Sequence, residues 1–303
     1  MRNEQFELGH KMLHEGSFDA SLTAFQAAIK LNSNDADAWN NVGLVLCKMT
    51  RYKASFVNYC EAIRLCPNNL QFKHNYASAL AKSGNVKKAI DIFKEIVELN
   101  PEMSNSWNDL SVYLELIGKS DESMIAHESA VLANPKDVIA LHNLGIALVR
   151  NKRNQEAIKA FERVVQLKPN SWLSRDQLAC LYVTDSRFYE AIDQYEKIIE
   201  GKPTFNNIYN LLAGVYELAS NYARATEIYF SIILKNPKNS EAYANLGICQ
   251  MARGVNENNP SICEEAIKNN LKALKLQPWN IQHWLKLAVA LRTLKYLKSG
   301  KLN

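Results

Sequence analysis

Apolar residues recur at steps of three and four along most of the chain, in short blocks separated by polar turns. Tyr76 and Leu80 begin one such stripe. After a turn at Gly84, the same spacing resumes with Phe93 and Val97. This spacing places apolar side chains on one face of a helix. The sequence therefore predicts pairs of amphipathic helices joined by short turns.

The predicted helix pairs repeat at an interval of 34 residues. Proline closes the second helix of every repeat but the first, which has Ser33 in its place, because proline lacks the backbone N–H that a helix interior needs. The proline position holds Pro67, Pro101, Pro135, Pro169, Pro203 and Pro237, and Pro278 follows after 41 residues. A small-residue position in the first helix holds Gly9, Gly43, Ala77, Ser111, Gly145, Ala179, Ala213, Gly247 and Ala288. The second helix has its own small position, at Ser21, Ser55, Ala89, Ser123, Ala157, Ala191, Ala225 and Ala266. Such a period is typical of stacked repeats, none of which buries its apolar face alone.

These residues resemble the tetratricopeptide repeat (TPR) family, whose pattern is W-x2-L-G-x2-Y followed by A, F, A and P. One repeat meets the pattern with Trp39, Val42, Gly43, Leu46, Ser55, Tyr59, Ala62 and Pro67. Another meets it with Tyr243, Leu246, Gly247, Ala266, Ala273 and Pro278. The resemblance implies an all-α fold, a right-handed superhelical solenoid of stacked helix-turn-helix repeats.

Eight repeats can be phased over residues 1–280, and residues 281–303 are expected to form a C-terminal capping helix and tail that solvates the end of the array. The long interval before Pro278 reflects a seven-residue insertion near residues 255–261. Its asparagines and Pro260 predict a surface loop, after which Ser261 and Glu264 form a capping box that restarts the helix. A secondary contact site in this loop is the alternative.

Composition and charge exclude several classes of protein. The hydrophobic content of 47% excludes a mainly disordered chain. The net charge of +5 over 303 residues is too small to indicate nucleic-acid binding. The sequence shows neither a secretory signal nor a stretch able to span a bilayer, so we expect no membrane insertion and a cytoplasmic location. The six cysteines form no C-x-x-C pair, which favours free thiols in a reducing compartment.

No catalytic constellation is found in the sequence, so we expect neither enzymatic activity nor a cofactor. His10 and His14 share a helix face, but no third ligand accompanies them, and no metal site is expected. The basic C-terminal residues Arg292, Lys295 and Lys298 have too few aromatic neighbours to indicate a nucleic-acid site.

The resemblance implies that the first helices line a concave groove. Two adjacent positions on each first helix are expected to face a ligand, and we call them the first and second polar positions. They hold Asn40 and Asn41, His74 and Asn75, Asn108 and Asp109, His142 and Asn143, Asp176 and Gln177, Asn210 and Leu211, and Ala244 and Asn245. All but Leu211 and Ala244 are candidate peptide-binding residues.

A row of carboxamides can recognise a polypeptide backbone, because each asparagine side chain carries one acceptor and two donors. In this respect the groove is similar to the TPR arm of the O-linked N-acetylglucosamine transferases, with Asn41, Asn75, Asn143 and Asn245 at matching positions. The alternative is that the chain is simply rich in asparagine throughout. The first polar position is nowhere basic, which argues against the carboxylate clamp of heat-shock co-chaperones.

The sequence therefore predicts a non-enzymatic scaffold or adaptor that binds a protein or peptide partner in extended conformation. The alternative is the substrate-docking arm of a glycosyltransferase whose catalytic domain lies outside this chain. The pattern carries no indication of oligomeric state.

Overall fold

The computed structural model describes residues 4–202, 204 and 207–299. Every regular element within these residues is an α-helix, and the helices follow one another as antiparallel pairs. The expected all-α solenoid of stacked helix pairs is confirmed. Pro203 lies outside the described residues, so its expected role in ending a helix stays a prediction.

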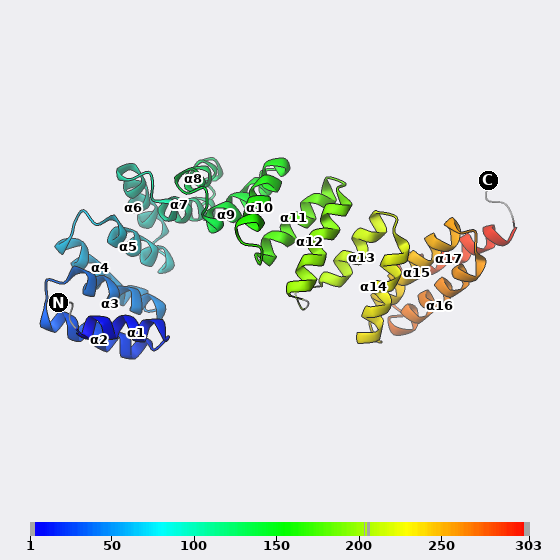
Figure 1. Ribbon diagram of the computed structural model, residues 1–303, viewed down its shortest axis with the longest axis horizontal. Helices are drawn as coiled ribbons and strands as arrows, with labels where there is room; N and C mark the ends of the chain where they lie inside the picture. The colour runs from blue at the N-terminus through cyan, green and yellow to red at the C-terminus, as the bar shows by residue number, and fades with distance from the viewer. Residues whose placement is uncertain (1–3, 203, 205–206, 300–303) are drawn as a thin grey trace. The chain divides into compact units, whose positions relative to one another are not determined.

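The chain divides into two compact units, Met1–Arg153 and Asn154–Asn303. The first unit contains α1 (Glu4–His14), α2 (Phe18–Leu31), α3 (Ala36–Lys48), α4 (Tyr52–Leu65), α5 (Leu70–Lys82), α6 (Val86–Leu99), α7 (Ser104–Leu116), α8 (Ser120–Ala133) and α9 (Val138–Arg150) (Figure 1). The second contains α10 (Asn154–Leu167), α11 (Trp172–Thr184), α12 (Phe188–Gly201), α13 (Ile208–Leu218), α14 (Tyr222–Lys235), α15 (Ser240–Asn256), α16 (Pro260–Leu276) and α17 (Ile281–Ser299). Odd-numbered helices are the first helices of the repeats, and even-numbered helices are the second.

The links between repeats are fixed by short polar turns at the prolines. After α8, the side chain of Asn134 accepts a hydrogen bond of 3.1 Å from the backbone N–H of Lys136. Asp137 then caps α9, since its Oδ1 accepts from the backbone N–H groups of Ile139 and Ala140 at 2.9 and 3.2 Å. Such capping satisfies donors that a helix start leaves unpaired. Asn134, just before Pro135, therefore ends one repeat, and Asp137, two residues after that proline, begins the next.

The small-residue position allows the two helices of a repeat to approach closely. A Cβ atom added at Gly43 would lie 2.7 Å from the ring of Tyr59, and one at Gly9 would lie equally close to the ring of Phe25. From Gly9 to Gly247 every residue at this position is buried. The hydroxyl of Ser21 in α2 donates to the backbone carbonyl of Gly9 at 2.8 Å. The second small position therefore adds a hydrogen bond to this contact.

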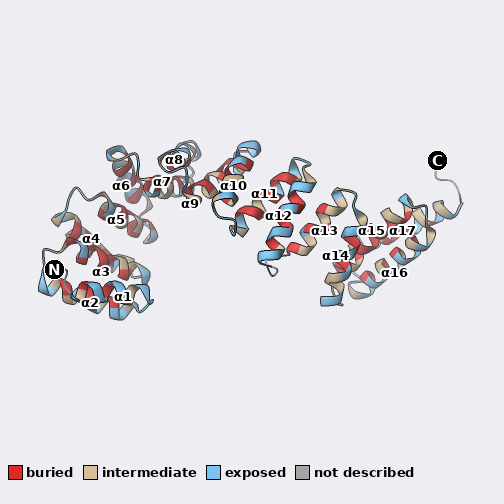
Figure 2. Cartoon of the chain, in the orientation of Figure 1, coloured by how far each residue is buried: buried red, intermediate tan, exposed pale blue. Residues whose placement is uncertain are grey.

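Buried residues, coloured red in Figure 2, lie where the helices of each unit face one another. Phe93 of α6 is an example in the first unit. It has no exposed surface and belongs to a cluster with Leu110 and Leu114 of the next repeat. Its ring stacks on that of Tyr113 at a centroid distance of 6.0 Å. One aromatic residue thus joins two neighbouring repeats, as expected for units that bury their apolar faces against each other.

The seven-residue insertion does not form the expected surface loop. Instead it lengthens both helices of the eighth repeat, because α15 and α16 each have 17 residues, against 13 in α3 and 14 in α4. The added turns pack together. Gly254 and Cys263 are buried, and a Cβ atom at Gly254 would lie 2.5 Å from the Cys263 sulfur. Only residues 257–259 connect the two helices.

The expected capping box of the eighth repeat is also wrong. Asn259 is the N-cap of α16, and its side chain accepts from the backbone N–H of Ser261 at 3.1 Å. Pro260 occupies the first turn, where its missing N–H costs nothing. Glu264 instead accepts a hydrogen bond of 2.7 Å from the ammonium group of Lys298 in α17. The helix therefore begins before the residue that the sequence pattern favoured.

The C-terminal helix α17 is present, but its exposed surface is more apolar than we expected for a helix that solvates the end of the array. Trp284, Leu285 and Leu291 are each more than half exposed. A terminal repeat of a solenoid usually turns a polar face outward. The apolar residues of α17 therefore need a separate explanation.

Candidate functional site

The two polar positions lie on the first helices, as expected, but their exposure differs along the chain. Asn40, Asn41 and His74 are buried and offer a ligand little surface. The remaining candidates are partly exposed: Asn75, Asn108, Asp109, His142 and Asn143 in the first unit, and Asp176, Gln177, Asn210 and Asn245 in the second. The surface open to a ligand in the first unit therefore lies on α5, α7 and α9.

Side-chain amides link neighbouring repeats in the first unit. The amide nitrogen of Asn75 donates to Oδ1 of Asn40 at 2.8 Å. The same bond, also at 2.8 Å, joins the amide nitrogen of Asn143 to Oδ1 of Asn108. In both pairs the second polar position bonds to the first polar position of the preceding repeat. The sequence reading assigned these amides to a ligand alone and missed this structural role.

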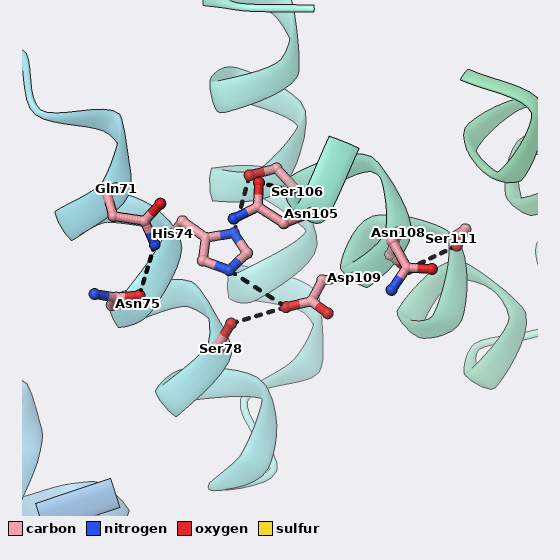
Figure 3. Close-up of polar contacts among 9 residues, drawn as sticks. All are labelled: Gln71, His74, Asn75, Ser78, Asn105, Ser106, Asn108, Asp109 and Ser111. Atoms are coloured by element: carbon pink, nitrogen blue, oxygen red, sulfur yellow. Dashed lines mark hydrogen bonds and ion pairs between the residues drawn. The ribbon is translucent and has the colours of Figure 1, made fainter. Parts of the chain in front are cut away.

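The repeats between these two pairs are linked by a second type of bond, which also involves the second polar position. Ser78 donates to a carboxylate oxygen of Asp109 at 2.9 Å (Figure 3). In the equivalent place two repeats earlier, the amide nitrogen of Asn41 lies 3.2 Å from Nε2 of His10. The second polar position here reaches a residue one turn further along the preceding first helix. His10, which we weighed as a metal ligand, is therefore part of the contact between repeats.

Burial keeps the histidines of this surface uncharged at neutral pH. Nδ1 of His74 lies 2.9 Å from the hydroxyl of Ser106, and its Nε2 is 3.7 Å from Asp109 (Figure 3). Burial lowers the pKa of His74 in spite of the nearby Asp109 carboxylate, which acts in the opposite direction. Burial also lowers the pKa of His142. The imidazoles therefore supply hydrogen bonds rather than positive charge.

The row of amides is interrupted in the second unit. Oδ1 of Asp176 is buried and has no hydrogen-bond partner among the described residues. Leu211 occupies the position from which Asn75 and Asn143 donate in their repeats, and it has no polar atom to offer. Burial raises the pKa of Asp176. Further along, Asn245 accepts a hydrogen bond of 2.7 Å from the ammonium group of Lys286.

We expect Asp176→Asn to raise the free energy of unfolding at pH 7 by about 1 kcal/mol, because it removes a charge from a buried position and leaves only a neutral unpaired acceptor. The folded-state pKa of Asp176 is raised, so the carboxylate disfavours folding once it ionises. The gain should vanish as the pH falls below about 4, where the carboxyl is protonated in both states. Denaturant titrations across this pH range measure it.

The matched control for this prediction is Asp109→Asn, in which the replaced carboxylate already accepts a hydrogen bond from Ser78. This substitution should not stabilise the chain. A gain at Asp176 that persists at acid pH would contradict the assignment to an unpaired charge.

Within the described residues, no group of three or more histidine, cysteine or acidic side chains is placed to hold a metal ion. All six cysteines are free thiols. None of the described helices combines the length and apolar character needed to cross a membrane.

Comparison with family models identifies three stretches of the chain as repeats. Models described as TPR repeat or tetratricopeptide repeat match residues 9–50, 70–103 and 138–171. Tetratricopeptide repeats are therefore present in this chain. No curated protein sequence matches it.

Solved TPR-like structures share the fold. PilF of Pseudomonas aeruginosa is 16% identical, with a TM-score of 0.59 over 67% of this chain and 92% of that one. The C-terminal part of a TPR repeat-containing protein of Cytophaga hutchinsonii is 17% identical, with a TM-score of 0.56 over 93% of this chain and 99% of that one. At such identities the likeness concerns the arrangement of helices.

Proposed function

We propose that the TPR array is a protein-interaction scaffold that binds an extended polypeptide segment along α5, α7 and α9. The observation that supports this most is the pair formed by Asn108 and Asn143. Both side chains are partly exposed, and one hydrogen bond joins them. Oδ1 of Asn143 and the amide nitrogen of Asn108 have no other partner among the described residues. These are one acceptor and one donor, which match the N–H and C=O of a peptide backbone.

The bond between the two amides makes them suitable for binding. It restricts the rotation of both side chains before a ligand arrives, so binding loses less conformational entropy. The equivalent pair of Asn40 and Asn75 has less to offer. Asn40 is buried, and the side-chain oxygen of Asn75 already accepts from Gln71 at 3.0 Å. The proposed contact is therefore centred on the fourth and fifth repeats.

A contact made by the neutral pair of Asn108 and Asn143 recognises a polypeptide backbone rather than a charged group. Asn108 and Asn143 carry no formal charge, and burial lowers the pKa of His74 and His142, so these imidazoles add none at neutral pH. Binding should therefore depend only weakly on salt concentration. A nucleic-acid ligand would instead show the steep salt dependence of phosphate neutralisation.

The likeness to the arm of the glycosyltransferases is less well supported. Of its four matching asparagines, Asn41 is buried beside His10 and Asn245 is bonded to Lys286. Asn75 and Asn143 remain partly exposed. We therefore favour a scaffold that contacts its partner over a shorter stretch of the first helices.

The test is the double substitution Asn108→Ala with Asn143→Ala. We expect affinity for extended peptides to fall by about one to two powers of ten, since two or more hydrogen bonds of ~0.5–1.5 kcal/mol each are lost. The probes are 12-residue peptides selected from a random library on the unaltered protein. Calorimetric titration measures their binding.

The control is the double substitution Asn40→Ala with Asn75→Ala, which also removes one amide bond between repeats. Both variants should lose a similar amount of thermal stability, so a difference in binding reports on ligand contact. If both variants bound the peptides as tightly as the unaltered protein does, these asparagines would be structural links only, and the basis of the proposal would be removed.

A further inference from the structure

Helix α17 occupies the place of a first helix in a ninth repeat. The indole N–H of Trp284 donates to the backbone carbonyl of Pro278 at 2.8 Å. The same bond, across the same six residues, joins Trp107 to Pro101 at 2.9 Å and Trp39 to Ser33 at 2.8 Å. The orientation of α17 at its start therefore reproduces that of α3 and α7.

One face of α17 lacks the cover that every other first helix has. Ala288 is exposed, although the small-residue position is buried in all eight preceding repeats. Leu291 is 51% exposed, whereas Leu46, at the same position of the second repeat, is 6% exposed. Equivalent leucines in the third, fourth and fifth repeats are also buried: Leu80, Leu114 and Leu148.

The missing cover corresponds to a second helix. In the second repeat, the ring of Tyr59 in α4 lies against Gly43, which is the position of Ala288 in α17. Trp284, Ala288 and Leu291 are spaced by four and three residues and so share one side of the helix. We call these three residues the ninth-repeat face. Among the described residues, no helix packs on it as α4 packs on α3.

The charge around this face is positive. Helix α17 contains no aspartate or glutamate. Lys286 and Lys298 have partners in Asn245 and Glu264, whereas Arg292 and Lys295 form no ion pair among the described residues. Lys295 follows Leu291 by four residues and therefore extends the same side of the helix. Two copies of this face would bring like charges together, which disfavours self-association.

We propose that the ninth-repeat face binds an acidic amphipathic helix of a partner protein, which docks as the second helix of a TPR repeat. This site is separate from the polar row and does not depend on the proposed peptide binding. The partner helix needs a small residue and, four residues later, an aromatic one, as in Ser55 and Tyr59 of α4. Its acidic residues would lie beside Arg292 and Lys295.

The chain itself supplies a suitable probe. A synthetic peptide with the sequence of α12, Phe188–Gly201, has Ala191 and Tyr195 at the required spacing and four acidic residues against one lysine. The peptide of α14, Tyr222–Lys235, keeps the spacing with Ala225 and Tyr229 but has two basic residues against one acidic. Fluorescence anisotropy of each labelled peptide, titrated with the whole protein, compares the two.

We expect saturable binding of the α12 peptide, at least about tenfold tighter than that of the α14 peptide, which corresponds to 1.4 kcal/mol. Leu291→Lys should weaken α12 binding by a similar factor, because it puts a charge in the apolar contact. The control is Leu271→Lys on α16, a leucine of nearly equal exposure that lies outside this face. It should leave binding unchanged.

Three results would overturn the proposal. Binding that Leu291→Lys and Leu271→Lys affect equally would place the peptide elsewhere on the protein. Equal affinity for the two peptides, or none up to about 1 mM, would exclude an acidic helix as the occupant. Concentration-dependent dimerisation in sedimentation experiments, abolished by Leu291→Lys, would show that a second copy of the chain covers this face instead.

Discussion

Replacing Phe93 with alanine is expected to lower the free energy of unfolding by about 3–5 kcal/mol, the usual cost of removing a fully buried aromatic side chain. The ring has no exposed surface and packs between the third and fourth repeats. Its loss leaves a cavity beside Leu110 and Leu114, which belong to the neighbouring repeat. Because repeats are stabilised by their neighbours, both repeats should be weakened. Chemical denaturation followed by circular dichroism measures the change.

A second readout makes this prediction more specific. The Phe93 ring contacts the imidazole of His74 edge to face, with 5.5 Å between the ring centroids. Burial is what lowers the pKa of that histidine. A hydrated cavity should therefore shift the pKa of His74 back towards its ordinary value, which an NMR titration follows. Phe230→Ala, at an exposed phenylalanine of α14, is the control and should cost less than about 1 kcal/mol. Similar losses in the two variants would contradict the packing described for Phe93.

Gly43→Ala is expected to destabilise the chain by about 1–3 kcal/mol, although alanine is the better helix former. The new methyl group would lie 2.7 Å from the ring of Tyr59. That ring cannot easily move, because it is almost completely buried and its hydroxyl lies 3.7 Å from the sulfur of Cys47. The helices of the second repeat must therefore separate. Thermal unfolding measures the loss.

Gly214→Ala is the matched substitution for this experiment. Gly214 also lies inside a first helix, but an added Cβ would meet no atom within 4 Å. Here the helix preference of alanine should prevail and stabilise the chain by up to about 1 kcal/mol. Stability changes of opposite sign for the two substitutions would establish close helix contact at Gly43. If Gly43→Ala were also stabilising, the close approach to Tyr59 would be wrong.

Much of the fold could be predicted because the same packing problem recurs in every repeat. The prolines, the small residues and the apolar spacing each repeat in phase, so an irregularity in one repeat, such as Ser33 at the proline position, does not hide the pattern. The insertion occurs once and has no such support. Its asparagines favour a turn locally, but packing of Gly254 against Cys263 favours continued helix. Tertiary contact of this kind outweighs local preference.

The candidate site was predicted in position but only partly in role. Sequence spacing placed the amides on the first helices, since spacing fixes which residues share a helix face. It could not identify their partners. Asn75 and Asn143 bond to residues 35 positions earlier, and that choice depends on how closely neighbouring repeats pack. The sequence spacing also could not predict the unpaired oxygen of Asp176. It arises because Leu211, 35 positions later, replaces a possible hydrogen-bond donor.

The longer helices of the eighth repeat affect how easily a protease could cleave the chain there. A polar surface loop through residues 255–261 would have offered an extended segment of the sort that proteases cleave. Instead, backbone hydrogen bonds and the packing of Gly254 on Cys263 protect most of this segment, leaving only residues 257–259 between two helices. An insertion absorbed in this way lengthens both helices of the repeat and leaves a connection of only three residues, so limited proteolysis at the insertion should be slow.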